Sequence, residues 1–99
     1  MFWARVSRKR CAYGHTGPVY YIGCLAGYPT IGRSMFLFYE VRSSEAPRVL
    51  ETAPVERVLY ELSTRLIFAQ THNSVYQIEI LDEAEAIDAL EAEGSLRSG

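Results

Sequence analysis

The chain has 99 residues, of which 48% are hydrophobic and 22% are charged, and its formal net charge is −2. This length suits one domain with one core, and such a small core leaves a thin stability margin, so we expect a homo-oligomer. No apolar run approaches the ~20 residues that a membrane helix needs. The early charge at Arg5 argues against a secretory signal peptide, so we expect a cytoplasmic protein with no membrane contact.

Two cysteines, Cys11 and Cys24, are too few for a disulfide scaffold and lack a second pair for zinc. We expect both to be reduced thiols, with a Cys11–Cys24 bridge as the alternative. The two histidines and two cysteines are widely spaced, so we expect neither a metal site nor a cofactor.

The charge is distributed unevenly along the chain. Residues 1–33 carry five basic side chains and no acid, whereas residues 82–99 carry six acids and one arginine. One end of the chain can therefore attract anions. The alternative is that the two ends neutralise each other across the fold.

Three stretches in the first half of the chain are rich in β-branched and aromatic residues and predict strands: residues 2–7, 19–25 and 34–41. The third is nearly all apolar and predicts a central strand covered on both sides. Loops should lie between them, and the basic run at residues 8–10 should close the first strand. Gly23 predicts a bulge or a close backbone approach within the second strand.

Residues 55–62 are ambiguous. Their apolar side chains recur at helical spacing, and Thr52 and Pro54 stand where a helix cap and first turn would lie. The valines, the tyrosine and the short length favour a strand over residues 55–61, with residues 62–64 as a hairpin tip. A polar turn over residues 42–47 and a short strand over residues 48–51 should precede it.

A hairpin is predicted from residues 65–71 and 75–80, because both segments have strand character and His72-Asn73-Ser74 is typical of a turn. A helix should follow over residues 82–93. Asp82 and Glu85 have capping-box spacing, and Gly94 is a natural stop. We expect Ala84, Ile87 and Leu90, with Ala86 nearby, to form its docking face and residues 95–99 to form a flexible tail.

These elements predict a mainly-β domain (α+β in minor part) over residues 1–94. We expect five to seven short antiparallel strands in a small barrel or open sandwich, with a C-terminal helix.

Three short patterns occur in order along the chain: Gly32-Arg33-Ser34-Met35, Glu51-Thr52-Ala53-Pro54-Val55 and Thr71-His72-Asn73-Ser74-Val75-Tyr76. This arrangement resembles short bacterial and phage proteins of unknown function that carry a Thr-Ser-Pro-Val-like stretch and a Thr-x-Asn-Ser-x-Tyr ending. The likeness covers roughly residues 31–80, and this chain has Ala53 where serine is expected. The resemblance implies a small β-barrel or sheet and a phage or mobile-element setting. It supports the strand over residues 55–61 and supplies no activity.

The candidate ligand site lies in the basic first third of the chain. Backbone N–H groups in a glycine-containing loop and nearby basic side chains can hold phosphate, and tyrosines can stack on a base. The candidate ligand-binding residues are Arg8, Lys9, Arg10, Tyr13, His15, Thr16 and Arg33. The spacing matches no P-loop or dinucleotide fingerprint. A solvated basic turn and tyrosines packed in a core or interface are the alternatives.

Secondary candidates are the polar side chains of Thr52, Thr71, Asn73 and Ser74. They could bind a base or ribose, but such groups more often cap turns, and we interpret them as fixing the register of the hairpin formed by residues 65–71 and 75–80. Neither Cys11 with His15 nor His72 with Ser74 has a recognisable third catalytic residue, so no catalytic residue is predicted.

We therefore expect a non-enzymatic binding module from a phage or mobile element. Its partner would be a small anionic, nucleotide-like ligand, sequestered to counter host defence. The alternative is an inhibitor or adaptor that binds a host protein through the acidic helix and exposed aromatic residues. Nucleic acid is disfavoured as a partner by the low net charge.

Overall fold

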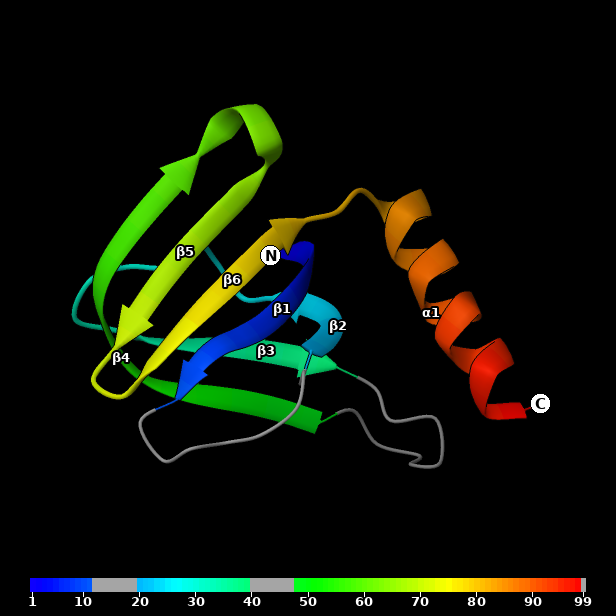
Figure 1. Ribbon diagram of the computed structural model, residues 1–99, viewed down its shortest axis with the longest axis horizontal. Coiled ribbons are helices and arrows are strands. Elements are labelled where there is room, and N and C mark those ends of the chain that lie inside the picture. The colour runs from blue at the N-terminus through cyan, green and yellow to red at the C-terminus, as the bar shows by residue number, and fades with distance from the viewer. Residues whose placement is uncertain (12–19, 40–47, 99) are drawn as a thin grey trace.

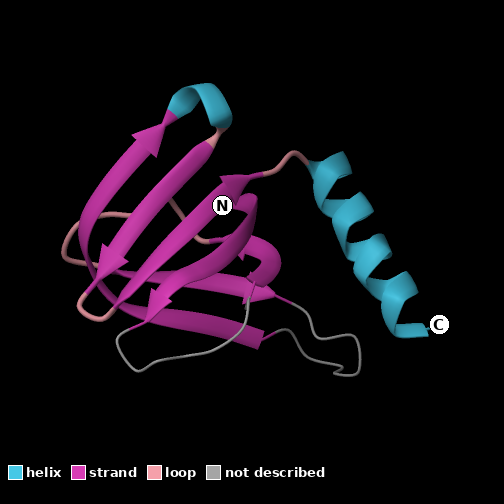
Figure 2. Ribbon diagram, in the orientation of Figure 1, coloured by secondary structure: helices cyan, strands magenta, loops and turns pink. Residues whose placement is uncertain are grey.

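The computed structural model describes residues 1–11, 20–39 and 48–98, which fold into a closed antiparallel barrel of six strands with one C-terminal helix (Figure 1). The strands pair in chain order, and β6 pairs back onto β1 to close the barrel. The elements are β1 (Phe2–Cys11), β2 (Tyr20–Leu25), β3 (Ser34–Tyr39), β4 (Arg48–Glu61), the single 3-10 turn η1 (Leu62–Thr64), β5 (Leu66–Thr71), β6 (Ser74–Ile80) and α1 (Glu83–Ser98). The mainly-β prediction is confirmed, and the barrel is the correct choice of architecture (Figure 2).

The core fills the inside of the barrel. Alternate side chains of each strand point inward, as the two-residue period of a strand requires. The buried cluster contains Ala4, Val6, Leu25, Met35, Leu37, Val55, Ile67, Ala69, Tyr76 and Ile78. Every strand contributes at least one of these residues, so the barrel has one continuous core.

Strand β4 is a single strand of 14 residues that curves around the barrel (Figure 1). Its first half pairs with β3 and its second half pairs with β5. The register shifts on both sides of this bend, between Ser34 and Phe36 on β3 and between Val55 and Arg57 on β4 itself. Bulges of this kind increase bending and twist, which lets so few strands close. The prediction of two separate strands over residues 48–51 and 55–61 is wrong in one respect, because Thr52-Ala53-Pro54 continues the strand.

The close approach predicted at Gly23 lies between β2 and β3. Gly23 is in register with Tyr39, and a Cβ atom at this position would lie 2.2 Å from the carbonyl oxygen of Phe38. The residue is therefore a close-contact point of the barrel wall.

Helix α1 packs on the outer face of β1 and β2, as Figure 1 shows. Ala86 is buried there beside Ile22 and Leu81, with Trp3 and Leu90 packed around them. The predicted docking face is partly right: Leu90 and the neighbouring Ala86 pack on the barrel, whereas Ala84 and Ile87 are exposed. The helix also continues past the predicted stop at Gly94 to Ser98, because an internal glycine costs a helix only about 1 kcal/mol.

Two further expectations differ from the structure. Strand β1 does not end at Ser7 but runs on through the basic residues to Cys11, because β6 offers a continuous pairing partner. Strand β3 is not covered on both sides, because Phe36 and Phe38 point outward and are 39% and 38% exposed. The predictions for residues 12–19, 40–47 and 99 lie outside the described residues.

Candidate binding site at one end of the barrel

Arg8 stands on the inner face of β1, near the end of that strand. It lies opposite Tyr76 of β6, and its guanidinium carbon is 5.7 Å from the centre of the Tyr76 ring. A cation over an aromatic face is held in place by the ring quadrupole. Lys9 follows as the extra residue of a bulge between Arg8 and Arg10, and its side chain is exposed.

Two further tyrosines line the same interior. Tyr21 of β2 and Tyr39 of β3 have ring centroids 4.9 Å apart, and both pack against the core cluster. Arg48 is in register with Tyr39 and is the exposed first residue of β4. Because side chains alternate along a strand, Arg48 lies on the same inward-facing side of β4 as Leu50 and the buried Thr52.

We name this group of five residues, Arg8, Tyr21, Tyr39, Arg48 and Tyr76, the basic end of the barrel. In an antiparallel barrel, β1 and β3 finish at the edge where β2, β4 and β6 begin, and all five residues stand close to that edge. Among the described residues, neither Arg8 nor Arg48 forms an ion pair with a carboxylate. Their guanidinium groups are therefore available to a phosphate or carboxylate, beside rings that can stack on a base.

The predicted ligand residues fall into three groups. Arg8, Lys9 and Arg10 lie on β1 at this end. Tyr13, His15 and Thr16 lie outside the described residues, in the segment that joins β1 to β2. Arg33 lies apart from them, because it directly precedes the first residue of β3, whereas the last residue of β3, Tyr39, lies at this end of the barrel.

Of the secondary candidates, Thr71, Asn73 and Ser74 lie beside the end of β1, because Ser74 is in register with Cys11. Thr71 is 1% exposed, and its hydroxyl donates to the Ser74 carbonyl across the turn. Ser74 is also buried, so Asn73 alone among these three has a partly exposed side chain. The interpretation of Thr71 as a residue that holds the hairpin turn agrees with this geometry.

Thr52 has a different role from the one predicted. Its hydroxyl oxygen accepts the Met35 N–H at 2.9 Å and donates to the Ala53 carbonyl at 2.8 Å. It therefore supports the bulge between β3 and β4, two strands that form no part of the hairpin of residues 65–71 and 75–80. Its hydroxyl is satisfied internally and is not free for a ligand.

The sequence did not identify Arg48, Tyr39 or Tyr76 as site residues. They are distant from Arg8 along the chain and reach it only through the barrel closure. The alternation within β3, β4 and β6 was the available signal, once the strands and their inward faces were known.

Cys24 lies on the outer face of β2, in register with Trp3, and its thiol is free. Burial raises the pKa of this thiol, which favours its protonated form at neutral pH. Cys24 is in register with Trp3 near the start of β1, whereas Cys11 is the last residue of that strand, so the two backbones lie too far apart for the alternative Cys11–Cys24 bridge.

Within the described ranges, no cluster of three or more histidine, cysteine or acidic side chains has the arrangement of a metal site. A search of the same residues finds no helix with the length and apolarity required to cross a membrane. Comparisons of the chain with protein-family models, with curated proteins and with solved structures give no match.

Proposed function

We propose that this protein is a non-enzymatic binding module that takes a small anionic, nucleotide-like ligand at the basic end of the barrel. The observation that carries the proposal is the juxtaposition of Arg8 and Arg48, unpaired among the described residues, with the rings of Tyr21, Tyr39 and Tyr76. Guanidinium groups recognise phosphate through paired hydrogen bonds, and aromatic rings stack on bases without regard to sequence.

The biological purpose that fits this chemistry is sequestration. The resemblance to short phage and bacterial proteins implies a mobile-element setting, where a tight binder of a nucleotide signal would weaken host defence. A sequestering protein needs affinity and no chemistry at the ligand.

The test is a thermal-shift and calorimetric screen with linear and cyclic nucleotides. Inorganic phosphate and uncharged nucleosides are the control ligands, because they separate the contribution of the phosphate from that of the base. We expect nucleotides to raise the melting temperature more than phosphate alone or a nucleoside alone, since binding to the native state stabilises it. No stabilisation at millimolar concentrations of any nucleotide would reject the proposal.

Variants locate the site. Arg8→Gln and Arg48→Gln should each weaken nucleotide binding by roughly 10- to 100-fold, the effect of losing a hydrogen bond to a charged group. Arg57→Gln is the matched control, because Arg57 is an exposed arginine in the second half of β4. Equal loss of affinity in all three variants would place the ligand elsewhere.

A second function, an inhibitor or adaptor that binds a host protein, has one observation in its favour. Phe36, Phe38 and Val49 are exposed together on the outer face of β3 and β4, and α1 exposes Asp88 and Glu91 on the barrel's flank. Aromatic residues in an exposed patch are typical of protein interfaces. A stoichiometric partner captured from host lysate, and lost with Asp88→Lys and Glu91→Lys together, would favour this function over nucleotide binding.

A further inference from the structure

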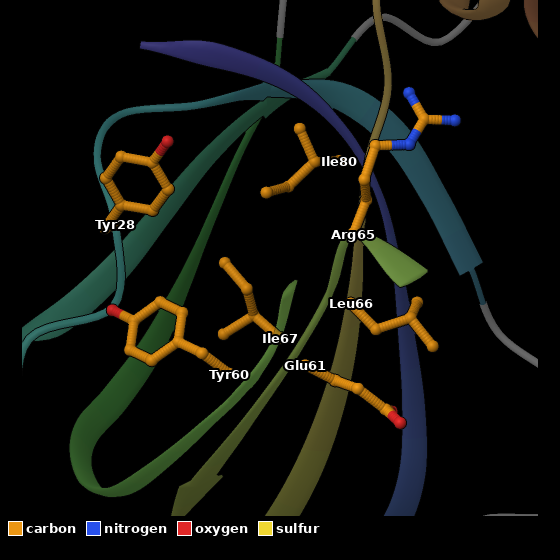
Figure 3. A pocket seen from close by; sticks show the side chains of 7 residues that line it. All are labelled: Tyr28, Tyr60, Glu61, Arg65, Leu66, Ile67 and Ile80. Atoms are coloured by element: carbon orange, nitrogen blue, oxygen red, sulfur yellow. The ribbon is translucent and has the colours of Figure 1, made fainter. Parts of the chain in front are cut away.

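A pocket of about 440 Å³ opens at the other end of the barrel, where β4 and β6 finish and β5 begins (Figure 3). In Figure 3, Ile67 and Ile80 lie between Tyr28 and Tyr60 on one side of the pocket and Arg65 and Leu66 on the other. Ile67 is 1% exposed and belongs to the core cluster, so the pocket reaches the barrel interior. Among the described residues, no ligand-binding or secondary candidate from the sequence lines it.

The tyrosine wall is held by contacts on both sides. The Tyr60 hydroxyl donates to the Pro29 carbonyl at 3.3 Å, which fastens the segment before β3 to the end of β4. The Tyr28 ring stacks on Phe2 with centroids 4.9 Å apart. Two rings are thus positioned beside the pocket before any ligand enters, which lowers the ordering cost of binding.

The described part of the pocket lining offers no free positive charge. Of these described lining residues, only Arg65 is basic, and its guanidinium group binds both carboxylate oxygens of Glu85, at 2.8 and 3.0 Å. Figure 3 shows this guanidinium extending away from the two tyrosines. Glu61 is the remaining charged residue of the lining, so a negative charge here would meet a carboxylate and an arginine that is already paired.

We propose that this pocket is a second binding site, for a small aromatic molecule that carries no negative charge. Its volume lies in the range of ligand pockets, about 300–1,000 Å³. Isoleucine side chains in its lining provide an apolar surface, and ring stacking on Tyr28 and Tyr60 favours a flat aromatic body. The basic end is proposed to bind an anion, whereas this pocket disfavours negative charge. Each site can therefore be tested with ligands that do not bind the other.

The test uses three probes that share an indole ring and differ in charge at neutral pH: 3-methylindole, tryptamine and indole-3-acetate. Binding is followed by NMR of the full chain labelled at its six isoleucine δ1 methyl groups. We expect 3-methylindole and tryptamine to shift the methyl signals of Ile67 and Ile80. The signals of Ile22 and Ile87, on the α1 side of the molecule, should stay in place.

Tyrosine variants provide the second readout. Tyr60→Ala and Tyr28→Ala should each weaken 3-methylindole binding at least fivefold. Tyr20→Ala should leave it unchanged, and it is a close control, because Tyr20 is 46% exposed and Tyr60 45%. If Tyr60→Ala does not fold, Tyr28→Ala carries the comparison, since Tyr28 is 61% exposed.

Three results would overturn the proposal. The first is the absence of any shift at Ile67 and Ile80 with all three probes at their solubility limits. The second is a shift centred on Ile22 or Ile87, which would indicate adsorption near the helix. The third is tighter binding of indole-3-acetate than of 3-methylindole, which would overturn the charge preference.

Discussion

The backbone carbonyl of Phe38 occupies the space that a side chain at Gly23 would need, at the contact between β2 and β3. Because the obstructing atom is the Phe38 backbone carbonyl, the strands must move apart to admit a methyl group. We expect Gly23→Ala to lower the free energy of unfolding by about 1–3 kcal/mol, the usual cost of overpacking. Gly27→Ala is the control, since a Cβ there meets nothing within 4 Å. Urea denaturation of both variants measures the difference, and an equal loss in the two would contradict the close-contact explanation.

Thr52 is the residue whose hydroxyl compensates for the register shift between β3 and β4. Thr52→Val keeps the shape of the side chain but leaves the buried Met35 N–H without its acceptor. The expected loss is about 1–3 kcal/mol of unfolding free energy, the cost of an unsatisfied buried donor. Thr52→Ser restores the hydroxyl and should recover most of the stability.

Hydrogen exchange at the Met35 amide provides a local readout of the same bond. We expect faster exchange in Thr52→Val than in Thr52→Ser, after correction for their global stabilities. Unchanged Met35 exchange in the valine variant would show that the threonine hydroxyl is not the acceptor that matters.

At the scale of elements, the start of α1 is tied to the barrel by Glu85. The pKa of Glu85 is lowered from 4.5 to about 2, first by its hydrogen bonds with Arg65 and then by the Asp82 N–H. Because the pKa is lower in the folded state, ionised Glu85 stabilises the fold above about pH 4.5. This stabilisation is lost as the pH falls from there towards 2.

The corresponding experiment is an NMR titration of the Glu85 carboxyl carbon in the intact protein. The wild-type midpoint should lie at about 2, and Arg65→Gln should raise it towards 4.5. Arg57→Gln, at an exposed position elsewhere on the barrel, should leave it in place. Identical midpoints in wild type and Arg65→Gln would remove the arginine as the cause.

The bulge in β4 explains why residues 55–62 looked helical in the sequence. Val55 points inward, Glu56 and Arg57 are both exposed around the register shift, and Val58 then packs on the core. One extra residue turns the two-residue period of a strand into a spacing of three, which is also the spacing of a helix face. Local pattern alone cannot separate the two, and the pairing of β4 with β5 decides it.

Other elements were predictable because their signals are local. The Asp82–Glu85 capping box forms as the spacing indicated, with the Glu85 N–H donating to Asp82 Oδ1 at 2.7 Å. The turn between β5 and β6 also lies at His72 and Asn73. By contrast, the length of β1 depends on β6, a strand far away in the sequence, so the basic residues 8–10 were wrongly expected to end it.

At the scale of the whole molecule, closure creates features that no single segment contains. The basic end joins residues from β1, β2, β3, β4 and β6, and the apolar pocket joins residues from β4, β5, β6 and the segment before β3. The sequence indicated the basic character of β1, but which tyrosines and which second arginine accompany it follows from strand order and register. The barrel therefore sets the composition of both candidate sites.

Closure also makes the stability of the barrel a collective property. Ile78 is 0% exposed and is paired with Val6 on one side and Ile67 on the other, so it lies at the seam between the first and last strands. Ile78→Val should lower the unfolding free energy by about 0.5–1.5 kcal/mol and Ile78→Ala by about 2–5 kcal/mol. The loss expected for Ile78→Ala is a substantial part of the ~5–15 kcal/mol by which a typical domain is stable. Leu59→Ala is the control and should change the unfolding free energy little, because Leu59 is 64% exposed.

If the seam holds the whole molecule, unfolding of these variants should remain a single transition. Far-UV circular dichroism follows the strands, and the fluorescence of Trp3, the one tryptophan, follows the contact between α1 and the barrel. We expect the two probes to give the same urea midpoint in wild type and in Ile78→Val, because β1 carries both Trp3 and the seam. A Trp3 transition at lower urea than the strand transition would mean that α1 detaches before the barrel opens. In that case the barrel would be stable without the contact of α1, and the helix would unfold independently of it.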